Sequence, residues 1–309
     1  MSHNEESQAR EIQGSVLEDP TPTAAMKADE KQAPAAGTNE YLDYYKRGSV
    51  LHNAGRLEDA LASYDQALEL RPDDYWAWYQ RGNVLDDLGR HKDAVVSYNK
   101  ALEVRPDDYW AWYHRGIALQ DLKCYEQSLA SYEKALELRP NDYWAWYQRG
   151  IALDDLGRLE DALTSFDKAL DIKPHDYWAQ YRRGEALRHA GHYEAAVTSY
   201  NQALEIKQDD YWAWHRRGLA QERLGLIEDA LSSFDKALET KPNDPEACYD
   251  KACCYAGLGN VEQAIKNLRY AINQNPDLYS KLAKKDAKFN AIRTDNRFLT
   301  LIAGNEGND

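Results

Sequence analysis

The sequence predicts an all-α solenoid, in which pairs of short helices stack in one direction and each pair buries its apolar face against the next. Three observations predict this fold class. A phrase that begins Asp-Tyr-Trp-Ala recurs every 34 residues. Apolar residues within each unit fall three and four positions apart, as they do on one face of a helix. Glycine and proline interrupt the chain between these helical stretches. A fixed period of this length is typical of repeats that are stable only when stacked.

The composition excludes several classes of protein. The chain has 309 residues and a net charge of -14, which argues against a nucleic-acid partner, because phosphate binding needs clustered Lys and Arg. No run approaches the roughly 18 apolar residues of a membrane helix. The N-terminal residues also contain no apolar stretch of the kind found in secretory signals. We therefore expect a soluble, cytoplasmic protein without a membrane partner.

Residues 1–40 are expected to form a disordered acidic tail. This segment has eight acidic and three basic residues, mixed with Ser, Gln, Pro, Gly and Ala. It can bury too little apolar surface to offset the conformational entropy lost on folding.

Seven units of 34 residues follow the tail, and each should form two antiparallel helices, A and B. Within unit 75–108, Asp74 is placed to cap helix A, Gly89 lies in the turn, and Pro106 ends helix B. The units are 41–74, 75–108, 109–142, 143–176, 177–210, 211–244 and 245–278. Residues 279–309 have a different pattern and should form a capping helix with a frayed C-terminus.

The pattern of the units resembles the tetratricopeptide repeat (TPR) family. The matching residues of the second unit are Trp78, Gly82, Leu85, Gly89, Ala94, Tyr98, Ala101 and Pro106. Lys123 at the turn glycine and Gln180 at the tryptophan are two of the few departures. The resemblance implies a right-handed superhelix of antiparallel helix pairs, with the helices A lining a concave groove.

Catalytic and metal-binding patterns are missing from the sequence. The four cysteines form no CxxC pair, so they fit neither a zinc site nor a disulfide framework. The one spaced pair of histidines, His189 and His192, has no cysteine nearby. No Walker A, G-x-S-x-G or G-x-G-x-x-G motif is present. The sequence therefore predicts a protein that is not an enzyme and has no cofactor or metal.

The expected binding surface is the groove-facing side of the helices A. Positions 2, 5, 9, 12 and 13 of each unit should point into the groove, opposite the position 4 tryptophans, which we expect in the core. Tryptophan at position 2 has two possible roles, as a structural wall of the groove or as a platform for a ligand. The candidate partner-binding residues are Trp76, Tyr79, Asp86, Trp110, Tyr113, Asp121, Trp144, Tyr147, Asp154, Trp178, Tyr181, Arg188, Trp212, His215 and Arg223.

Charge is expected to change along this groove. Positions 12 and 13 are mainly acidic in the second to fourth units, whereas later units include Arg188 and Arg223. A segment with basic residues at one end and acids at the other would be complementary. The role of the arginine at position 7 of the first six units stays open between stacking on tryptophan and pairing with acids.

The function that the sequence predicts is a protein-protein interaction scaffold that binds a segment of a partner protein. One alternative is an aromatic groove that binds single-stranded RNA or a glycan by stacking. Another is a regulatory or assembly subunit of a larger complex.

Overall fold

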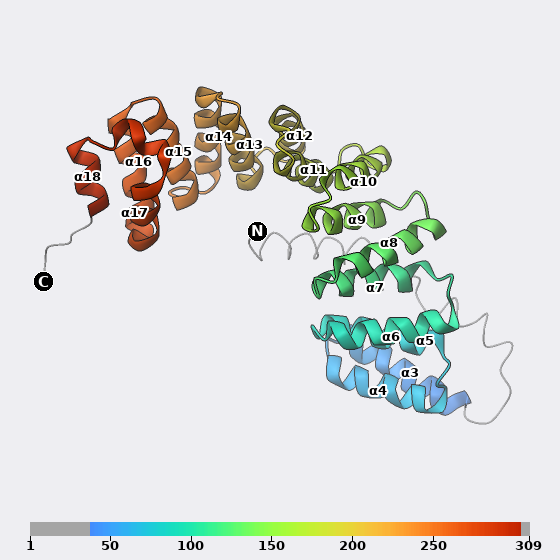
Figure 1. Cartoon of the computed structure of the whole chain (residues 1–309). Helices are drawn as coiled ribbons and strands as arrows, with labels where there is room; N and C mark the ends of the chain where they lie inside the picture. The colour runs from blue at the N-terminus through green and yellow to red at the C-terminus, as the bar shows by residue number, and fades with distance from the viewer. Residues whose placement is uncertain (1–37, 304–309) are drawn as a thin grey trace, which may run out of the picture. The chain divides into compact units, whose positions relative to one another are not determined.

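The structure is a computed structural model, and it describes residues 38–303. All regular secondary structure in this part of the chain is helical (Figure 1). The prediction of an all-α solenoid of antiparallel helix pairs is therefore confirmed. The first helix of the described residues begins at Thr38, within the segment expected to be a tail. The rest of that expected tail, and the expected frayed end beyond residue 303, lie outside the described residues.

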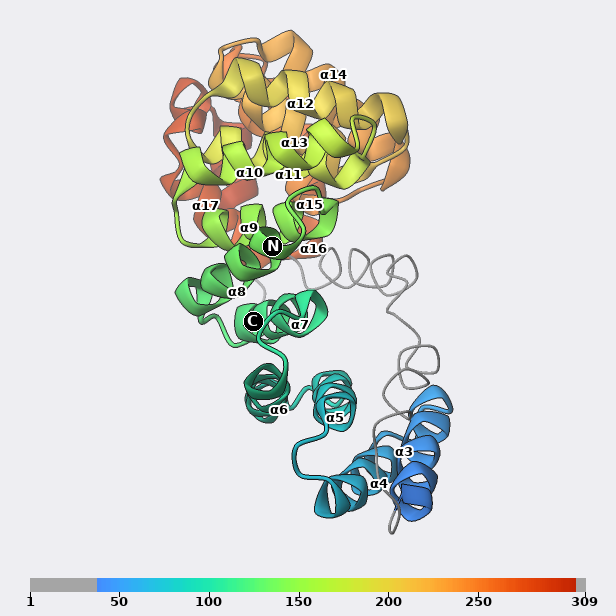
Figure 2. The ribbon, with the colours of Figure 1, turned by 90° about the vertical axis from the view of Figure 1, so that its right-hand side faces the viewer.

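Seven helix pairs follow one another within residues 38–303. They are α3 (Thr38–Asn53) with α4 (Leu57–Leu70), α5 (Tyr75–Asp87) with α6 (His91–Val104), α7 (Tyr109–Asp121) with α8 (Tyr125–Leu138), α9 (Tyr143–Asp155) with α10 (Leu159–Ile172), α11 (Tyr177–His189) with α12 (Tyr193–Ile206), α13 (Tyr211–Arg223) with α14 (Ile227–Thr240), and α15 (Pro245–Gly257) with α16 (Val261–Gln274). The two helices of a pair pack side by side, as Figure 2 shows for α5 and α6.

The last pair is covered by a short C-terminal cap. The cap consists of α17 (Pro276–Lys285), the 3-10 helix η2 (Ala287–Ile292) and α18 (Asn296–Ala303). Phe289 and Phe298 of the cap are fully buried and share a core with residues of α15 and α16.

The chain divides into two compact units, which we describe separately. The first unit ends at Ile172 and contains α3–α10. The second unit begins at Lys173 and contains α11–α18.

Close packing within a pair depends on a glycine of helix A. A Cβ atom added to Gly82 would lie 2.5 Å from Cε1 of Tyr98, a fully buried ring of helix B. The same relation joins Gly116 to Tyr132 at 2.5 Å. Since real Cβ atoms do not approach carbon so closely, only glycine lets the aromatic ring lie flat against helix A.

The turn between helices A and B keeps one backbone conformation even where its residue changes. Gly89 has φ 72°, and Lys123, which replaces the glycine in the third repeat, has φ 59°. Both values lie in the left-handed region that favours glycine. The turn of the third repeat therefore keeps the left-handed conformation, although the Cβ atom of Lys123 disfavours it.

The prediction that the tryptophans at position 4 are core residues is wrong, since they are only partly buried. The indole N–H of Trp78 donates to the carbonyl of Pro72 at 2.7 Å, and that of Trp112 donates to Pro106 at 2.8 Å. Each ring thus lies across the turn between two repeats. Gln180, which replaces this tryptophan, donates its amide to the equivalent carbonyl of Pro174 at 3.4 Å.

Candidate functional site

The residues at position 5 are core residues, which corrects the prediction that they face an open groove. They are Tyr79, Tyr113, Tyr147, Tyr181 and His215, and each is at most 2% exposed. Tyr79 packs on Tyr98 of helix B with ring centroids 6.1 Å apart, and on His114 of the next helix A at 5.8 Å. Position 5 therefore faces the junction between successive helices A.

The tryptophans at position 2 divide into two groups. Trp76 and Trp110 are 5% and 7% exposed, which fits a structural wall better than a platform. The guanidinium of Arg105 lies 5.5 Å from the ring centre of Trp76, and that of Arg139 lies 5.1 Å from Trp110. The other three are half-buried and keep part of their surface in solvent: Trp144, Trp178 and Trp212.

Carboxylates crowd together at the ends of the helices A in the first unit. Asp86 and Asp87 end α5, Asp121 ends α7, and Asp154 lies one residue before the end of α9. Burial raises the pKa of Asp86, and although His91 lowers it, the charges of Asp121 and Asp87 raise it further. This end of the unit is therefore strongly electronegative.

Histidines lie among these carboxylates. Nε2 of His52 is 2.6 Å from a carboxylate oxygen of Asp87. Nδ1 of His91 is 2.7 Å from Asp86 and 3.8 Å from Asp121. Sequence reasoning missed this association, because positions 12 and 17 of one repeat and position 13 of the next meet only after the repeats stack.

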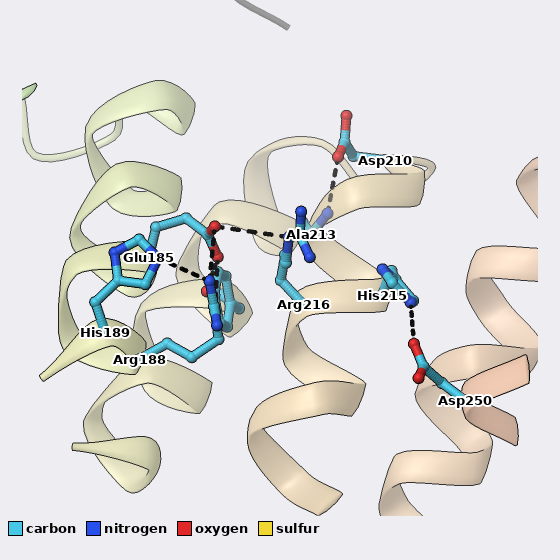
Figure 3. A network of polar contacts seen from close by, with 9 residues as sticks. Glu185, Arg188, His189, Asp210, Ala213, His215, Arg216 and Asp250 are labelled. Carbon is cyan, nitrogen blue, oxygen red and sulfur yellow. Dashed lines mark hydrogen bonds and ion pairs between the residues drawn. The ribbon is translucent and has the colours of Figure 1, made fainter. Parts of the chain in front are cut away.

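The second unit contains a buried carboxylate between two arginines (Figure 3). Glu185 of α11 is 2% exposed. One of its oxygens lies 3.2 Å from Nε of Arg188, and the other lies 3.6 Å from Nε of Arg216 on α13. Tyr200 of α12 also donates its hydroxyl to Glu185. Sequence reasoning did not single out Glu185, because no other helix A has an acid at this position, position 9.

The charge of Glu185 changes the prediction for Arg188. Burial alone would raise the pKa of Glu185, but Arg216, Arg188 and the Tyr200 bond together hold it below its ordinary value. The carboxylate is therefore ionised at neutral pH. Its negative charge offsets part of the positive charge that the sequence predicts for the later repeats. Arg188 is partly buried and paired with Glu185.

The predicted residues His215 and Arg223 have different environments. His215 is buried, and its Nε2 lies 2.9 Å from Asp250 of α15 (Figure 3). Arg223 is exposed at the end of α13 and lines a hollow of about 340 Å³. Lys288 of the cap lies at the same hollow, 2.7 Å from Glu222. Of these residues, Arg223 is the one available to a partner.

The cysteines beside this hollow are unsuited to nucleophilic chemistry. Cys253 and Cys254 are each 2% exposed, and burial raises the pKa of both thiols. A raised pKa leaves little thiolate, which is the reactive form.

No helix of residues 38–303 combines the length and the apolar character needed to cross a membrane.

Comparison with known proteins agrees with the repeat geometry. The family described as tetratricopeptide repeat matches residues 75–108, 109–142 and 143–176, and a second description of the same repeat matches 223–285. The description TPR repeat matches 48–89 and 184–225. No curated protein matches the chain.

Several solved structures share the fold. YrrB, described as a TPR protein with an unusual peptide-binding site, is 23% identical, with a TM-score of 0.55 over 61% of this chain and 97% of its own. A TPR protein from Parabacteroides merdae is 19% identical, with a TM-score of 0.60 over 80% and 98%. The C-terminal part of a TPR protein from Cytophaga hutchinsonii is 16% identical, with a TM-score of 0.66 over 75% and 96%. The matched repeats span most of the sequence, and the chain belongs to the tetratricopeptide repeat family.

Proposed function

We propose that the chain is a non-enzymatic interaction scaffold, and that its first compact unit binds a basic segment of a partner protein. The observation that carries the proposal is the crowding of Asp86, Asp87 and Asp121 at one end of this unit: burial raises the pKa of Asp86, and the charges of Asp121 and Asp87 raise it further. Carboxylates that repel one another gain free energy when a cationic side chain binds among them.

Polar groups should dominate this recognition. Trp76 and Trp110 are almost fully buried, so they offer little surface to a partner. Asp87 and Asp155 are exposed at the ends of α5 and α9, where a lysine or arginine of the partner can reach them. Trp144 is half-buried and is a candidate for stacking on the partner.

The tetratricopeptide repeat family supports a protein or peptide as the ligand. TPR proteins are typical interaction scaffolds, and YrrB is described as having a peptide-binding site. In the second unit, taken by itself, Arg223, Trp178 and Trp212 are exposed or half-buried and are candidates for contact with a partner.

Selection from a random peptide library tests this function. We expect peptides rich in Lys and Arg, bound with an affinity that falls as salt rises. The paired variant Asp87→Asn with Asp155→Asn should weaken binding by about tenfold, since each exposed charge pair contributes up to about 1 kcal/mol. Glu137→Gln is the control, because Glu137 is an exposed acid on helix B that pairs with Lys134. Selection of peptides without basic residues, or unchanged binding by the paired variant, would contradict the proposal.

A further inference from the structure

Three side chains with metal-binding atoms converge at one end of the first unit. Asp86 comes from the end of α5, His91 from the start of α6, and Asp121 from the end of α7. One donor atom from each residue lies within 4.8 Å of the other two. Tetrahedral zinc with ligands at about 2.1 Å holds its donor atoms about 3.4 Å apart. Nδ1 of His91 lies 2.7 Å from Asp86, which is a hydrogen-bond distance, and 3.8 Å from Asp121, so a bound zinc ion would replace the hydrogen bond between His91 and Asp86.

These three side chains are shielded but not sealed from solvent. Their exposed fractions are 20% for Asp86, 25% for His91 and 9% for Asp121. Partial burial strengthens the attraction between carboxylates and a cation. It also leaves a path by which an ion and a water molecule can reach the donor atoms.

The neighbouring His114 does not neutralise the carboxylates. Burial lowers the pKa of His114 to about 4, although the charge of Asp87 opposes the shift. The imidazole is therefore neutral at pH 7 and contributes no positive charge. Its buried Nε2 has no hydrogen-bond partner. His114 therefore adds no positive charge to this end of the unit.

Comparison between repeats singles out His91. It occupies position 17, the first residue of helix B, which is apolar or aromatic in every other repeat: Leu57, Tyr125, Leu159, Tyr193, Ile227 and Val261. The first and second repeats allow a direct comparison. His52, at position 12 of the first repeat, lies 2.6 Å from Asp87, at position 13 of the second. Position 17 of the first repeat is Leu57, which has no metal-binding atom, so only two such side chains meet there.

We propose that Asp86, His91 and Asp121 form a binding site for a divalent ion of the zinc class. One imidazole nitrogen with two carboxylate oxygens suits Zn²⁺ or Co²⁺, whereas Mg²⁺ prefers oxygen ligands alone. Three protein ligands leave one tetrahedral position for water. The sequence pattern predicts no metal, because Asp121 lies 30 residues beyond His91 and reaches it only when the repeats stack. The proposal does not rest on the proposed partner binding, because a chain that binds no basic peptide can still bind zinc.

Metal titration of the full chain tests the site. Isothermal titration with Zn²⁺ should give one strong site, and Co²⁺ should develop the visible absorption of a low-coordinate complex that EDTA removes. Mg²⁺ at the same concentration should give no comparable heat. Affinity should fall at acid pH, because protons compete for His91 and the carboxylates.

His91→Leu is the decisive variant, because leucine stands at the same place in the first and fourth repeats. It should melt like the original protein without metal but lose about 100-fold or more in Zn²⁺ affinity, since loss of a supporting partner alone costs about 10- to 100-fold. Asp121→Asn should weaken the same site. His52→Leu is the control and should leave the affinity unchanged. Absence of Zn²⁺ binding, or affinity in His91→Leu within about threefold of the original, would overturn the proposal. Equal losses in His91→Leu and His52→Leu would overturn it too, since the ion would then lie elsewhere.

Discussion

Arg81 on α5 donates a hydrogen bond from Nη1 to the hydroxyl of Ser97 on α6 at 2.7 Å. Its Nε lies 2.6 Å from Asp65 on α4, in the preceding repeat. Its guanidinium carbon also lies 5.6 Å from the ring centre of Trp78. The arginine at position 7 therefore has both roles that the sequence leaves open, since it stacks on a tryptophan and pairs with an acid. The bond to serine recurs in Arg115–Ser131, Arg149–Ser165, Arg183–Ser199 and Arg217–Ser233.

Arg115→Ala should lower the free energy of unfolding by about 1.5–4.5 kcal/mol. The variant removes bonds to Ser131 and Asn99 and the contact with Trp112, and each contributes about 0.5–1.5 kcal/mol. Arg47→Ala is the control, because Arg47 has the same position in the first repeat but is exposed. Urea unfolding followed by circular dichroism measures both. Equal effects of the two variants would show that the bonds between helices contribute nothing.

Gly116→Ala should destabilise the protein by about 1–3 kcal/mol through overpacking. The new Cβ would lie 2.5 Å from Cε1 of Tyr132, which is buried and has no space to move. Gly257→Ala is the matched control, because nothing lies within 4 Å of a Cβ there. That variant should be neutral or slightly stabilising, since alanine favours helix. Thermal melts distinguish the two, and a neutral Gly116→Ala would refute the close approach of ring and helix.

Trp110→Ala should lower the free energy of unfolding by about 3–5 kcal/mol, as expected for a large core truncation. Trp110 is 7% exposed and stacks on His114 with ring centroids 6.1 Å apart. Trp212→Ala should cost less, because Trp212 is only half-buried. If Trp110→Ala kept its melting temperature but lost partner binding, Trp110 would be a platform for a ligand rather than a structural wall.

Glu185→Gln should destabilise the protein by about 3 kcal/mol at pH 7, because it leaves Arg188 and Arg216 without their buried counter-charge. The folded state lowers the pKa of Glu185 below its ordinary value of 4.5. The stabilisation is therefore complete above that value and is lost as the pH falls through the folded-state pKa. The difference between the original protein and the variant should shrink in acid.

Melting temperatures measured from pH 7 to pH 3 test this linkage. Glu194→Gln serves as the control, since Glu194 is exposed on α12. A difference for Glu185→Gln that stays constant across this range would contradict the role of its charge.

The repeat pattern predicts the helix pairs well, because the spacing of small and aromatic residues within 34 residues reports contacts inside one repeat. Gly82 and Tyr98 are such a pair. The direction of the side chains on helix A is harder to predict. Sequence spacing defines the direction in which a side chain points from the axis of its own helix. Only the packing of successive helices A decides whether that direction leads to solvent or, as for Tyr79, to His114.

Contacts between repeats explain the rest of what sequence reasoning missed. Asp86 and Asp121 are 35 residues apart, and no local pattern brings them to His91. Glu185 is similarly held by Arg216 from the next helix A. Such groups become neighbours only through stacking, so a motif read within one repeat does not contain them.

The reach of Arg115 has a consequence for the evolution of the gene. Its bonds extend to its own repeat and to Asn99 of the preceding one, and no farther. If recombination removed residues 109–142, Arg149 would stand 16 residues after Asn99, as Arg115 does now, and Asp155 would take the place of Asp121. Gain or loss of whole repeats therefore changes the length of the protein while each junction keeps its chemistry, whereas a deletion of any other length would destroy every junction that it touches.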